Sequence, residues 1–242
     1  MIDPRLESVD KRRDATRKLN ALPFIGGIQD EDWLNKWDSL LEIELSIDKW
    51  SEQEAISTII NSIPEGSALF VGSSRPVRDI EAISRYRAGI RTFANRGLAG
   101  IDGNISTAWG ISECFERSYS ILGDLTFLHD ISALVNPVSS NHCIFVIDNN
   151  GGGIFSTLPQ AGTKGFEEVF GTPHGLNLES IAESFGISVT RAKNSSDIAL
   201  QINKSGLRIV IIEVPSRDEN AAFVKELHQR AAKAARMGIN LA

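Results

Sequence analysis

The sequence predicts a doubly wound α/β domain, in which a mainly parallel sheet carries helices on both faces. From about residue 52 onward, short runs rich in Val, Ile and Phe alternate with segments of helical periodicity. The run at residues 209–212 (Ile-Val-Ile-Ile) is apolar at every position, which is typical of a strand buried on both faces. We therefore expect one sheet between two helical layers.

The predicted strands and helices alternate along the chain. Strands are predicted over residues 68–72, 91–94, 118–122, 143–147, 187–190 and 208–214. Helices are predicted over residues 77–87, 101–115, 128–136, 178–185, 197–203 and 220–237. The basic side chains late in the last helix suit the negative end of the helix dipole, and we expect them to face solvent.

Residues 1–50 differ in composition from the rest of the chain, because three of the four tryptophans lie there. An apolar stripe at helical spacing is formed by Trp33, Trp37, Leu40 and Leu41. This pattern predicts an amphipathic helix that packs on something other than its own segment. We predict a boundary after residue 50, with a linker and helix before it and the sheet domain over residues 51–242.

Composition excludes several classes of protein. The 242 residues carry 25 Lys+Arg and 31 Asp+Glu, a net charge of −6, so neither a nucleic-acid partner nor an anionic membrane is expected. No run of 18 apolar residues occurs and the first residues are charged, so we predict no membrane insertion and a cytoplasmic location. Cys114 and Cys143 lie in apolar surroundings without metal-ligand spacing and are predicted to be buried free thiols.

Polar residues follow two consecutive predicted strands. Gly123 and Asp124 follow the strand at 118–122, and Asn149 with a glycine-rich loop follows the next strand. Ligands of doubly wound sheets bind at the carboxyl ends of the strands, and neighbouring strands would place the two side chains together. A carboxylate, a carboxamide oxygen and a loop carbonyl suit Mg²⁺ bound to a diphosphate. We therefore predict Asp124, Asn149 and the Gly151 carbonyl as ligands of Mg²⁺.

Other interpretations of these residues are weaker. Gly-Asp after a strand is also an ordinary turn or helix cap. A nicotinamide or flavin site would need G-x-G-x-x-G in the first strand-helix turn, and residues 151–156 lack the last glycine. The G-x-x-x-x-G-K-[ST] phosphate-binding motif does not occur either.

Four stretches, in this order, resemble one enzyme family. They are residues 95–103 (NRGLAGIDG), 123–130 (GDLTFLHD), 151–159 (GGGIFSTLP) and 170–175 (FGTPHG). The chain resembles 2-succinyl-5-enolpyruvyl-6-hydroxy-3-cyclohexene-1-carboxylate synthase of menaquinone biosynthesis over residues 69–214. The resemblance implies a thiamine diphosphate- and Mg²⁺-dependent transferase, which decarboxylates 2-oxoglutarate and adds the succinyl unit to isochorismate.

The resemblance also implies which residues bind the cofactor. They are Arg96, Gly97, Ile101, Gly123, Asp124, Leu125, Thr126, Asn149, Gly151, Gly152, Ile154 and Phe155. Ile101 would bend the cofactor into its reactive shape, and Ile154 with Phe155 would form an apolar wall that favours loss of CO₂. Asp148 stands where the family more often has an asparagine, and little effect on metal binding is expected.

Catalytic and substrate-binding roles are implied for Ser74, Arg78, Arg96 and Phe155. Both substrates carry carboxylates, which the planar guanidinium of arginine can bind through two hydrogen bonds. From the residues alone, Arg78 could equally be a solvated residue in the first turn of a helix. His129 and His174 are interpreted as structural hydrogen-bonding residues.

The family that the chain resembles has three parts: a pyrimidine-binding domain, a middle domain and a diphosphate-binding domain. Residues 51–242 match the last, and residues 1–50 are interpreted as a linker and a remnant of the middle domain. The glutamate that activates the cofactor is expected from a pyrimidine-binding domain of the same enzyme or a partner subunit, in a homo-oligomer. Two hypotheses stay open: a part of the synthase that is active with that domain, or a catalytically silent module that binds thiamine diphosphate and Mg²⁺.

Overall fold

The computed structural model describes residues 31–41, 46–84, 87–137 and 141–241. The sheet belongs to a compact unit within residues 44–234, and α1 (Glu31–Leu41) belongs to a second unit with the end of α8 (Arg217–Leu241). α1 confirms the predicted tryptophan-bearing helix, and Trp33 and Trp37 are 60% and 53% exposed. Residues 1–30 lie outside the described residues, and the boundary after residue 50 stays a prediction.

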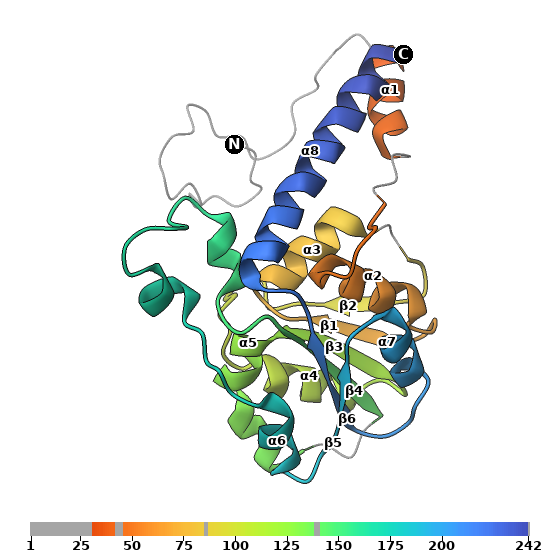
Figure 1. Cartoon of the computed structure of the whole chain (residues 1–242). Helices are drawn as coiled ribbons and strands as arrows, with labels where there is room; N and C mark the ends of the chain where they lie inside the picture. The colour runs from red at the N-terminus through yellow and green to blue at the C-terminus, as the bar shows by residue number, and fades with distance from the viewer. Residues whose placement is uncertain (1–30, 42–45, 85–86, 138–140, 242) are drawn as a thin grey trace, which may run out of the picture. The chain divides into compact units, whose positions relative to one another are not determined.

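All six predicted strands form, and every pair of neighbours is parallel. The order across the sheet is β2-β1-β3-β4-β6-β5 (Figure 1). The strands are β1 (Ala68–Val71), β2 (Arg91–Phe93), β3 (Ser118–Gly123), β4 (His142–Asp148), β5 (Ser188–Ala192) and β6 (Arg208–Glu213).

Helices cover both faces of the sheet, as the doubly wound fold requires (Figure 1). α2 (Glu52–Ser62), α3 (Arg75–Ile83) and α7 (Ser195–Ile202) lie on one face. α4 (Asn104–Ser112), α5 (Asp124–His129) and α6 (Leu178–Glu183) lie on the other. Successive side chains of β4 point to opposite faces of the sheet. Phe145 packs in the core beneath α2, and Ile144 packs in the core beneath α4.

The predicted helix at residues 128–136 is wrong. α5 instead begins at Asp124, directly after β3, and is followed by the 3-10 turn η1 (Ile131–Val135). Between them the carboxylate of Asp130 accepts hydrogen bonds from the backbone N–H and hydroxyl of Ser106. This attachment to α4 holds Asp130 in a non-helical conformation, so one continuous helix cannot form.

Three further segments were not predicted. The first is α2, which is capped by Ser51, because the Ser51 hydroxyl accepts a hydrogen bond from the Glu54 N–H. After β4 come the 3-10 helix η2 (Gly153–Thr157) and the π-helix η3 (Glu167–Gly171). Both follow glycine-rich sequence without helical periodicity, which explains why the pattern did not indicate them.

The two cysteines are free thiols, as predicted, but only one is buried. Cys143 lies inside β4, and burial raises the pKa of its thiol to about 12. Cys114 is exposed, because it follows the end of α4 in a turn at the surface. The expectation of two buried thiols is therefore wrong for Cys114.

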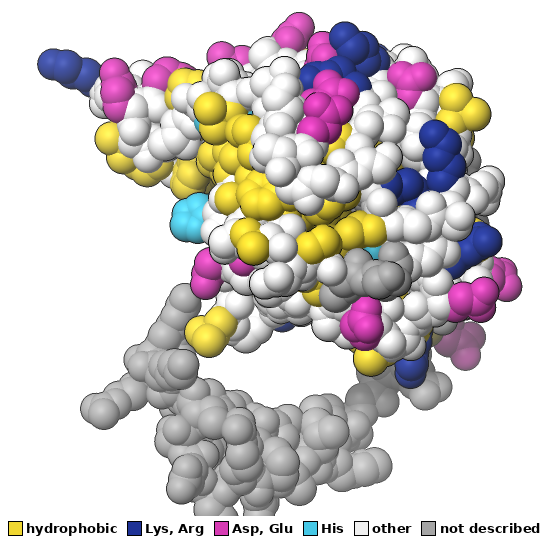
Figure 2. Space-filling model, turned by 90° about the horizontal axis from the view of Figure 1, so that it is seen from below, with side chains coloured by type: hydrophobic (Ala, Val, Ile, Leu, Met, Phe, Trp, Pro, Cys, Tyr) yellow, Lys and Arg dark blue, Asp and Glu magenta, His cyan; other side chains and the backbone are white. Residues whose placement is uncertain are grey.

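The surface of the α4–α6 layer carries apolar side chains. Figure 2 views the molecule from this side and shows hydrophobic side chains in a band across the middle, with charged groups around it. Among the helices of the described ranges, none is both long and apolar enough to cross a membrane.

The strand order places a topological switch point between β1 and β3. The chain leaves β1 toward β2 at one side and returns to β3 at the other side. Loops at the carboxyl ends of β1 and β3 therefore diverge and leave a crevice, which is where ligands bind in open α/β sheets.

Candidate functional site

A cavity of about 150 Å³ lies at this switch point. Its walls come from the loops after β1, β3 and β4, and from the turn before α4. The lining residues are Ser73, Ser74, Arg75, Pro76, Ile101, Gly123, Asp124, Leu125, Thr126, Asn149, Gly151, Gly152, Gly153, Ile154 and Phe155. We call this cavity the cleft.

Asp124 lies in the cleft at the end of β3 and is 2% exposed. Its Oδ1 accepts a hydrogen bond from the N–H of Leu125 at 2.6 Å, and its Oδ2 accepts one from the N–H of Gly151 at 2.7 Å. Two backbone donors therefore fix the carboxylate, which retains lone pairs for a cation.

Asn149 lies at the end of the neighbouring strand, because β3 and β4 pair with Gly123 opposite Ile147. Its Nδ2 donates a hydrogen bond to Glu52 Oε1 at 2.7 Å. Its Oδ1 is buried and has no hydrogen-bond partner among the described residues. A buried carboxamide oxygen without a partner is costly unless a ligand satisfies it, so this atom fits the predicted role as a metal ligand.

The glycine loop is shaped by close backbone contacts. Gly151 has φ +133°, and a Cβ there would lie 2.2 Å from the carbonyl oxygen of Gly171. A Cβ at Gly152 would lie 2.2 Å from the carbonyl oxygen of Phe170. Only glycine fits these two positions. The Gly151 carbonyl accepts a hydrogen bond from the N–H of Gly153 at 2.9 Å and keeps a second lone pair.

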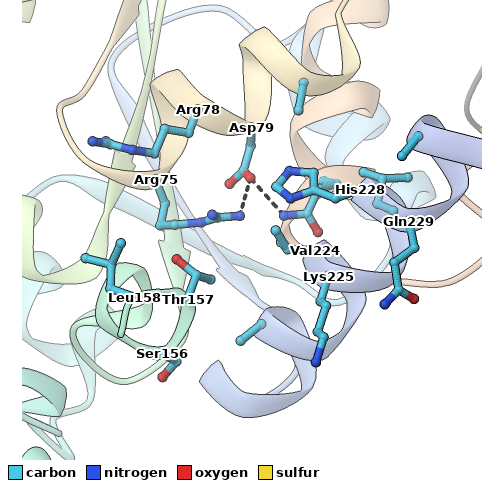
Figure 3. Close-up of a pocket in the computed structure, with 15 residues that line it drawn as sticks. Arg75, Arg78, Asp79, Ser156, Thr157, Leu158, Val224, Lys225, His228 and Gln229 are labelled. Atoms are coloured by element: carbon cyan, nitrogen blue, oxygen red, sulfur yellow. Dashed lines mark hydrogen bonds and ion pairs between the residues drawn. The ribbon is translucent and has the colours of Figure 1, made fainter. Parts of the chain in front are cut away.

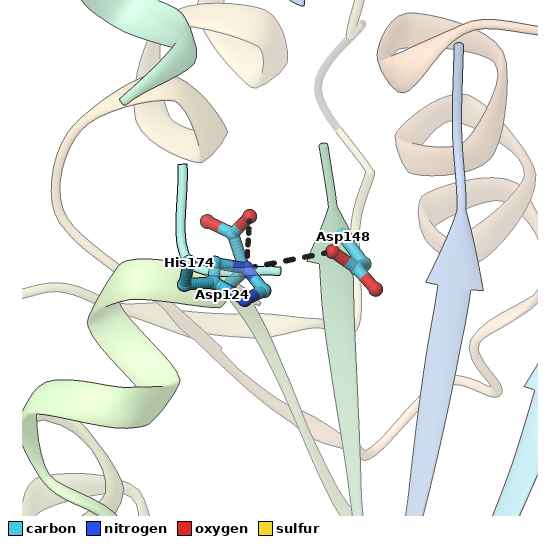
Figure 4. Close-up of side chains that lie close together, drawn as sticks. All are labelled: Asp124, Asp148 and His174. Atoms are coloured by element: carbon cyan, nitrogen blue, oxygen red, sulfur yellow. Dashed lines mark hydrogen bonds and ion pairs between the residues drawn. The ribbon is translucent and has the colours of Figure 1, made fainter. Parts of the chain in front are cut away.

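His174 approaches the cleft from the loop after η3 (Figure 4). Its Nε2 lies 3.2 Å from Asp124 Oδ2 and 3.8 Å from Asp148 Oδ1. The N–H of Leu176 donates to Nδ1, so Nε2 carries the proton that Asp124 accepts. This hydrogen bond raises the pKa of His174, and burial, followed by the charge of Asp124, raises the pKa of Asp148.

These three side chains offer ligand atoms within 4.8 Å of one another, so a cation could be held there. Asp124 belongs both to this group and to the set predicted from the sequence. From the sequence, His174 was expected to be a structural hydrogen-bonding residue, and Asp148 had no predicted site role. Nothing near His174 in the sequence marks its contact with Asp124, which lies 50 residues away.

Glu52 is a site residue that sequence reasoning missed. It is 2% exposed at the start of α2, and its Oε2 lies 3.6 Å from Arg75 Nε. Arg75 also pairs with Asp79, which accepts a hydrogen bond from Gln53 Nε2 at 2.9 Å. Burial, followed by the nearby charge of Asp79, raises the pKa of Glu52 to about 7. The buried carboxylates and Arg75 form one network behind the cleft.

A larger pocket of about 740 Å³ adjoins this network (Figure 3). Arg75 and Arg78 from α3 lie on one side, and Val224, Lys225 and His228 from α8 lie on another. In Figure 3 Arg75 points toward Asp79, whereas Arg78 extends away from it. Arg78 and Lys225 bring positive charge beside an apolar surface, which suits a small carboxylate, whereas the charge of Arg75 is paired with Asp79 in the same wall.

The predicted substrate-binding residues are divided between the two cavities. Ser74 lines the cleft with φ +79°, a strained conformation for a side chain with a Cβ. Arg78 lines the larger pocket, and its guanidinium donates a hydrogen bond to the Ser74 carbonyl at 2.7 Å. Arg96 and Gly97 are exposed and line neither cavity.

The predicted apolar wall lies in the cleft. Ile154 and Phe155 belong to η2, and Ile101 lies in the turn before α4 rather than inside that helix as predicted. The ring of Phe155 packs against Phe170, with centroids 5.4 Å apart. This contact fixes the ring where it covers the glycine loop.

Comparison with known proteins assigns the chain to a family. Residues 80–214 match the family model described as thiamine pyrophosphate enzyme, C-terminal TPP binding domain. The 2-succinyl-5-enolpyruvyl-6-hydroxy-3-cyclohexene-1-carboxylate synthase of Thermobifida fusca is 38% identical over 207 residues, which are 82% of this chain and 37% of that protein. The synthase of the same name from Saccharopolyspora erythraea is 32% identical over 93% of this chain and 42% of that protein.

A solved structure shares the fold at low sequence identity. Benzoylformate decarboxylase from Polynucleobacter necessarius superposes with a TM-score of 0.55 at 15% identity, covering 72% of this chain and 35% of that chain. The two curated synthases are also much longer than this chain, which spans 37% and 42% of their lengths.

Proposed function

We propose that the cleft binds the diphosphate of thiamine diphosphate through Mg²⁺, since the chain belongs to the thiamine pyrophosphate enzyme family, as a C-terminal TPP-binding domain. One observation carries this proposal. Asp124 and Asn149 end neighbouring parallel strands, and the buried Oδ1 of Asn149 has no partner among the described residues. A carboxylate and a free carboxamide oxygen beside a glycine loop suit a hard cation that also binds phosphate.

In this proposal Asp124, Asn149 and the Gly151 carbonyl hold Mg²⁺. Gly151 and Gly152 line the cleft, and neither carries a side chain that would stand between its backbone and a diphosphate. Bound thiamine diphosphate supplies the electron sink for decarboxylation of a 2-oxo acid. Ile154 and Phe155 line the cleft and would exclude water there, and surroundings of low polarity favour loss of CO₂.

We further propose that the reaction is that of the named relatives. The substrates are 2-oxoglutarate, which is decarboxylated, and isochorismate, which receives the succinyl unit, in menaquinone biosynthesis. Arg78 and Ser74 bind substrate carboxylates, and the position of Arg78 in the wall of the larger pocket supports its role. The proposal keeps Arg96 and Gly97 in their predicted roles, although they line neither cavity of this chain.

The reaction requires a pyrimidine-binding domain, from the same enzyme or from a partner subunit, in a homo-oligomer. The chain matches only 37% of the Thermobifida fusca synthase, so the remaining part of that relative can serve as a test partner. This chain supplies the diphosphate and Mg²⁺ half of the site.

Reconstitution tests this function. The chain is mixed with the unmatched N-terminal part of the Thermobifida fusca synthase, and CO₂ release from 2-oxoglutarate is measured with and without isochorismate. We expect turnover that requires Mg²⁺ and thiamine diphosphate. Cofactor binding without turnover, in a mixture shown to associate, would contradict catalysis and favour a silent binding module.

A further inference from the structure

We infer that Glu52 is a positioning residue, which orients the carboxamide of Asn149 so that Oδ1 faces the cation. This inference rests on the proposed Mg²⁺ site. The Oε1 of Glu52 accepts a hydrogen bond from Asn149 Nδ2 at 2.7 Å, across 97 residues of sequence. The opposite end of the same carboxamide is the buried Oδ1 that has no partner among the described residues.

The chemistry of the pair selects one of the two amide orientations. An ionised carboxylate only accepts hydrogen bonds, so the NH₂ group of Asn149 faces Glu52 whenever Glu52 is ionised. Rotating the amide by half a turn would place its oxygen against the carboxylate and its NH₂ group toward the cation site. The reversed amide would lose a hydrogen bond and present a donor to a cation, so both ends favour the observed orientation.

Glu52 is itself held in place. Its N–H donates to Asn220 Oδ1 at 3.1 Å, and Asn220 Nδ2 donates to the carbonyl of Pro215 at 2.6 Å. Arg75 Nε lies 3.6 Å from the second oxygen of Glu52 and favours the carboxylate form, against the burial and the Asp79 charge that raise the pKa of Glu52 to about 7. The acceptor is therefore fixed to the start of α2 and to the loop before α8.

Gly153 passes close to the amide nitrogen of Asn149. A Cβ on Gly153 would lie 2.5 Å from Asn149 Nδ2. A residue without a side chain is therefore needed at position 153 to leave space for the carboxamide. Partners that orient a metal ligand in this way change metal affinity by about 10–100-fold when they are removed.

The test replaces the acceptor without changing its shape. Glu52→Gln can donate as well as accept, so it permits both orientations of Asn149. We expect Mg²⁺-dependent binding of thiamine diphosphate to the full chain, measured by calorimetry, to weaken about 10–100-fold. Glu54→Gln is the matched control on the same helix, because the Glu54 carboxylate bonds Ser195 and Thr58 and not Asn149. Melting curves show whether each variant folds.

A donor-acceptor swap separates positioning from a general structural role. Asn149→Asp places a second carboxylate against Glu52 and should weaken binding, whereas Glu52→Gln combined with Asn149→Asp restores a donor to the pair. We expect the double variant to bind at least about tenfold more tightly than Asn149→Asp alone. Additive losses in the double variant, or unchanged affinity in Glu52→Gln, would overturn the inference while leaving the metal site intact. If the unsubstituted chain binds no Mg²⁺ with thiamine diphosphate, both this inference and the proposed function are wrong.

Discussion

The backbone N–H of Gly151 donates a hydrogen bond to Asp124 Oδ2 at 2.7 Å, and it links the loop after β4 to the end of β3. The same loop bonds η3 through the N–H of Gly152 and the carbonyl of Gly171 at 2.7 Å. The glycine loop therefore has a defined shape through contacts within the chain alone. A site arranged in this way loses little conformational freedom when a ligand binds.

Replacing Gly151 should damage both stability and binding. Gly151→Ala puts a Cβ 2.2 Å from the Gly171 carbonyl oxygen at φ +133°, so we expect a loss of about 3 kcal/mol in the free energy of unfolding. Gly110→Ala is the control, because Gly110 lies in α4 with nothing within 4 Å of a Cβ. Urea unfolding should show that this control gains about 0.5–1 kcal/mol. Equal stability of the two variants would contradict the described loop.

Replacing Arg78 should weaken substrate binding and leave cofactor binding unchanged. Removing a charged hydrogen bond costs about 1.5–3 kcal/mol, so Arg78→Ala should raise the KM for 2-oxoglutarate or isochorismate about 10–100-fold in the reconstituted enzyme. The calorimetric affinity for thiamine diphosphate with Mg²⁺ should stay the same. Arg91→Ala is the control, because Arg91 is exposed at the amino end of β2. An unchanged KM in Arg78→Ala would show that Arg78 does not bind substrate.

Stability should fall in acid partly because of His142. This side chain is 0% exposed, with Nδ1 2.6 Å from the Ser118 hydroxyl and Nε2 3.0 Å from the Ser120 hydroxyl. Burial, followed by the charge of Arg208, lowers its pKa from 6.5 to about 3. Between these values the unfolded chain binds a proton that the folded chain does not, so the free energy of unfolding decreases as the pH falls.

The expected contribution of His142 is about 1.4 kcal/mol per pH unit within that window. His142→Gln cannot take up this proton on unfolding. The difference in unfolding free energy between the variant and the unsubstituted chain should therefore change with pH below 6.5 and be constant above it. Urea unfolding at several pH values measures this difference, and a difference independent of pH would show that His142 does not remain neutral in the fold.

The strands were predictable because burial on both faces leaves a clear sequence pattern. The run Ile209-Val210-Ile211-Ile212 is fully buried in β6, and its alternate residues serve the two cores. The start of α5 was not predictable in the same way. Gly123 stays extended and the helix begins at once at Asp124, without a polar cap residue to mark it.

The site was predictable only where its residues follow strands. Asp124 and Asn149 stand directly after apolar runs, so the topology of a parallel sheet brings them together. Glu52 and His174 reach Asn149 and Asp124 across 97 and 50 residues. The sequence Ser51-Glu52-Gln53-Glu54 has the capping-box pattern and could have located α2, but no local pattern pairs Glu52 with Asn149.

The most direct test is calorimetry of thiamine diphosphate with Mg²⁺ on the unsubstituted chain and on Asp124→Asn. Asp32→Asn, an exposed change in α1, is the control. We predict Mg²⁺-dependent binding to the unsubstituted chain and to the control, and a loss of at least about 100-fold for Asp124→Asn, since it removes the carboxylate ligand. Equal affinity of Asp124→Asn and the unsubstituted chain would contradict the placement of the cation at the ends of β3 and β4.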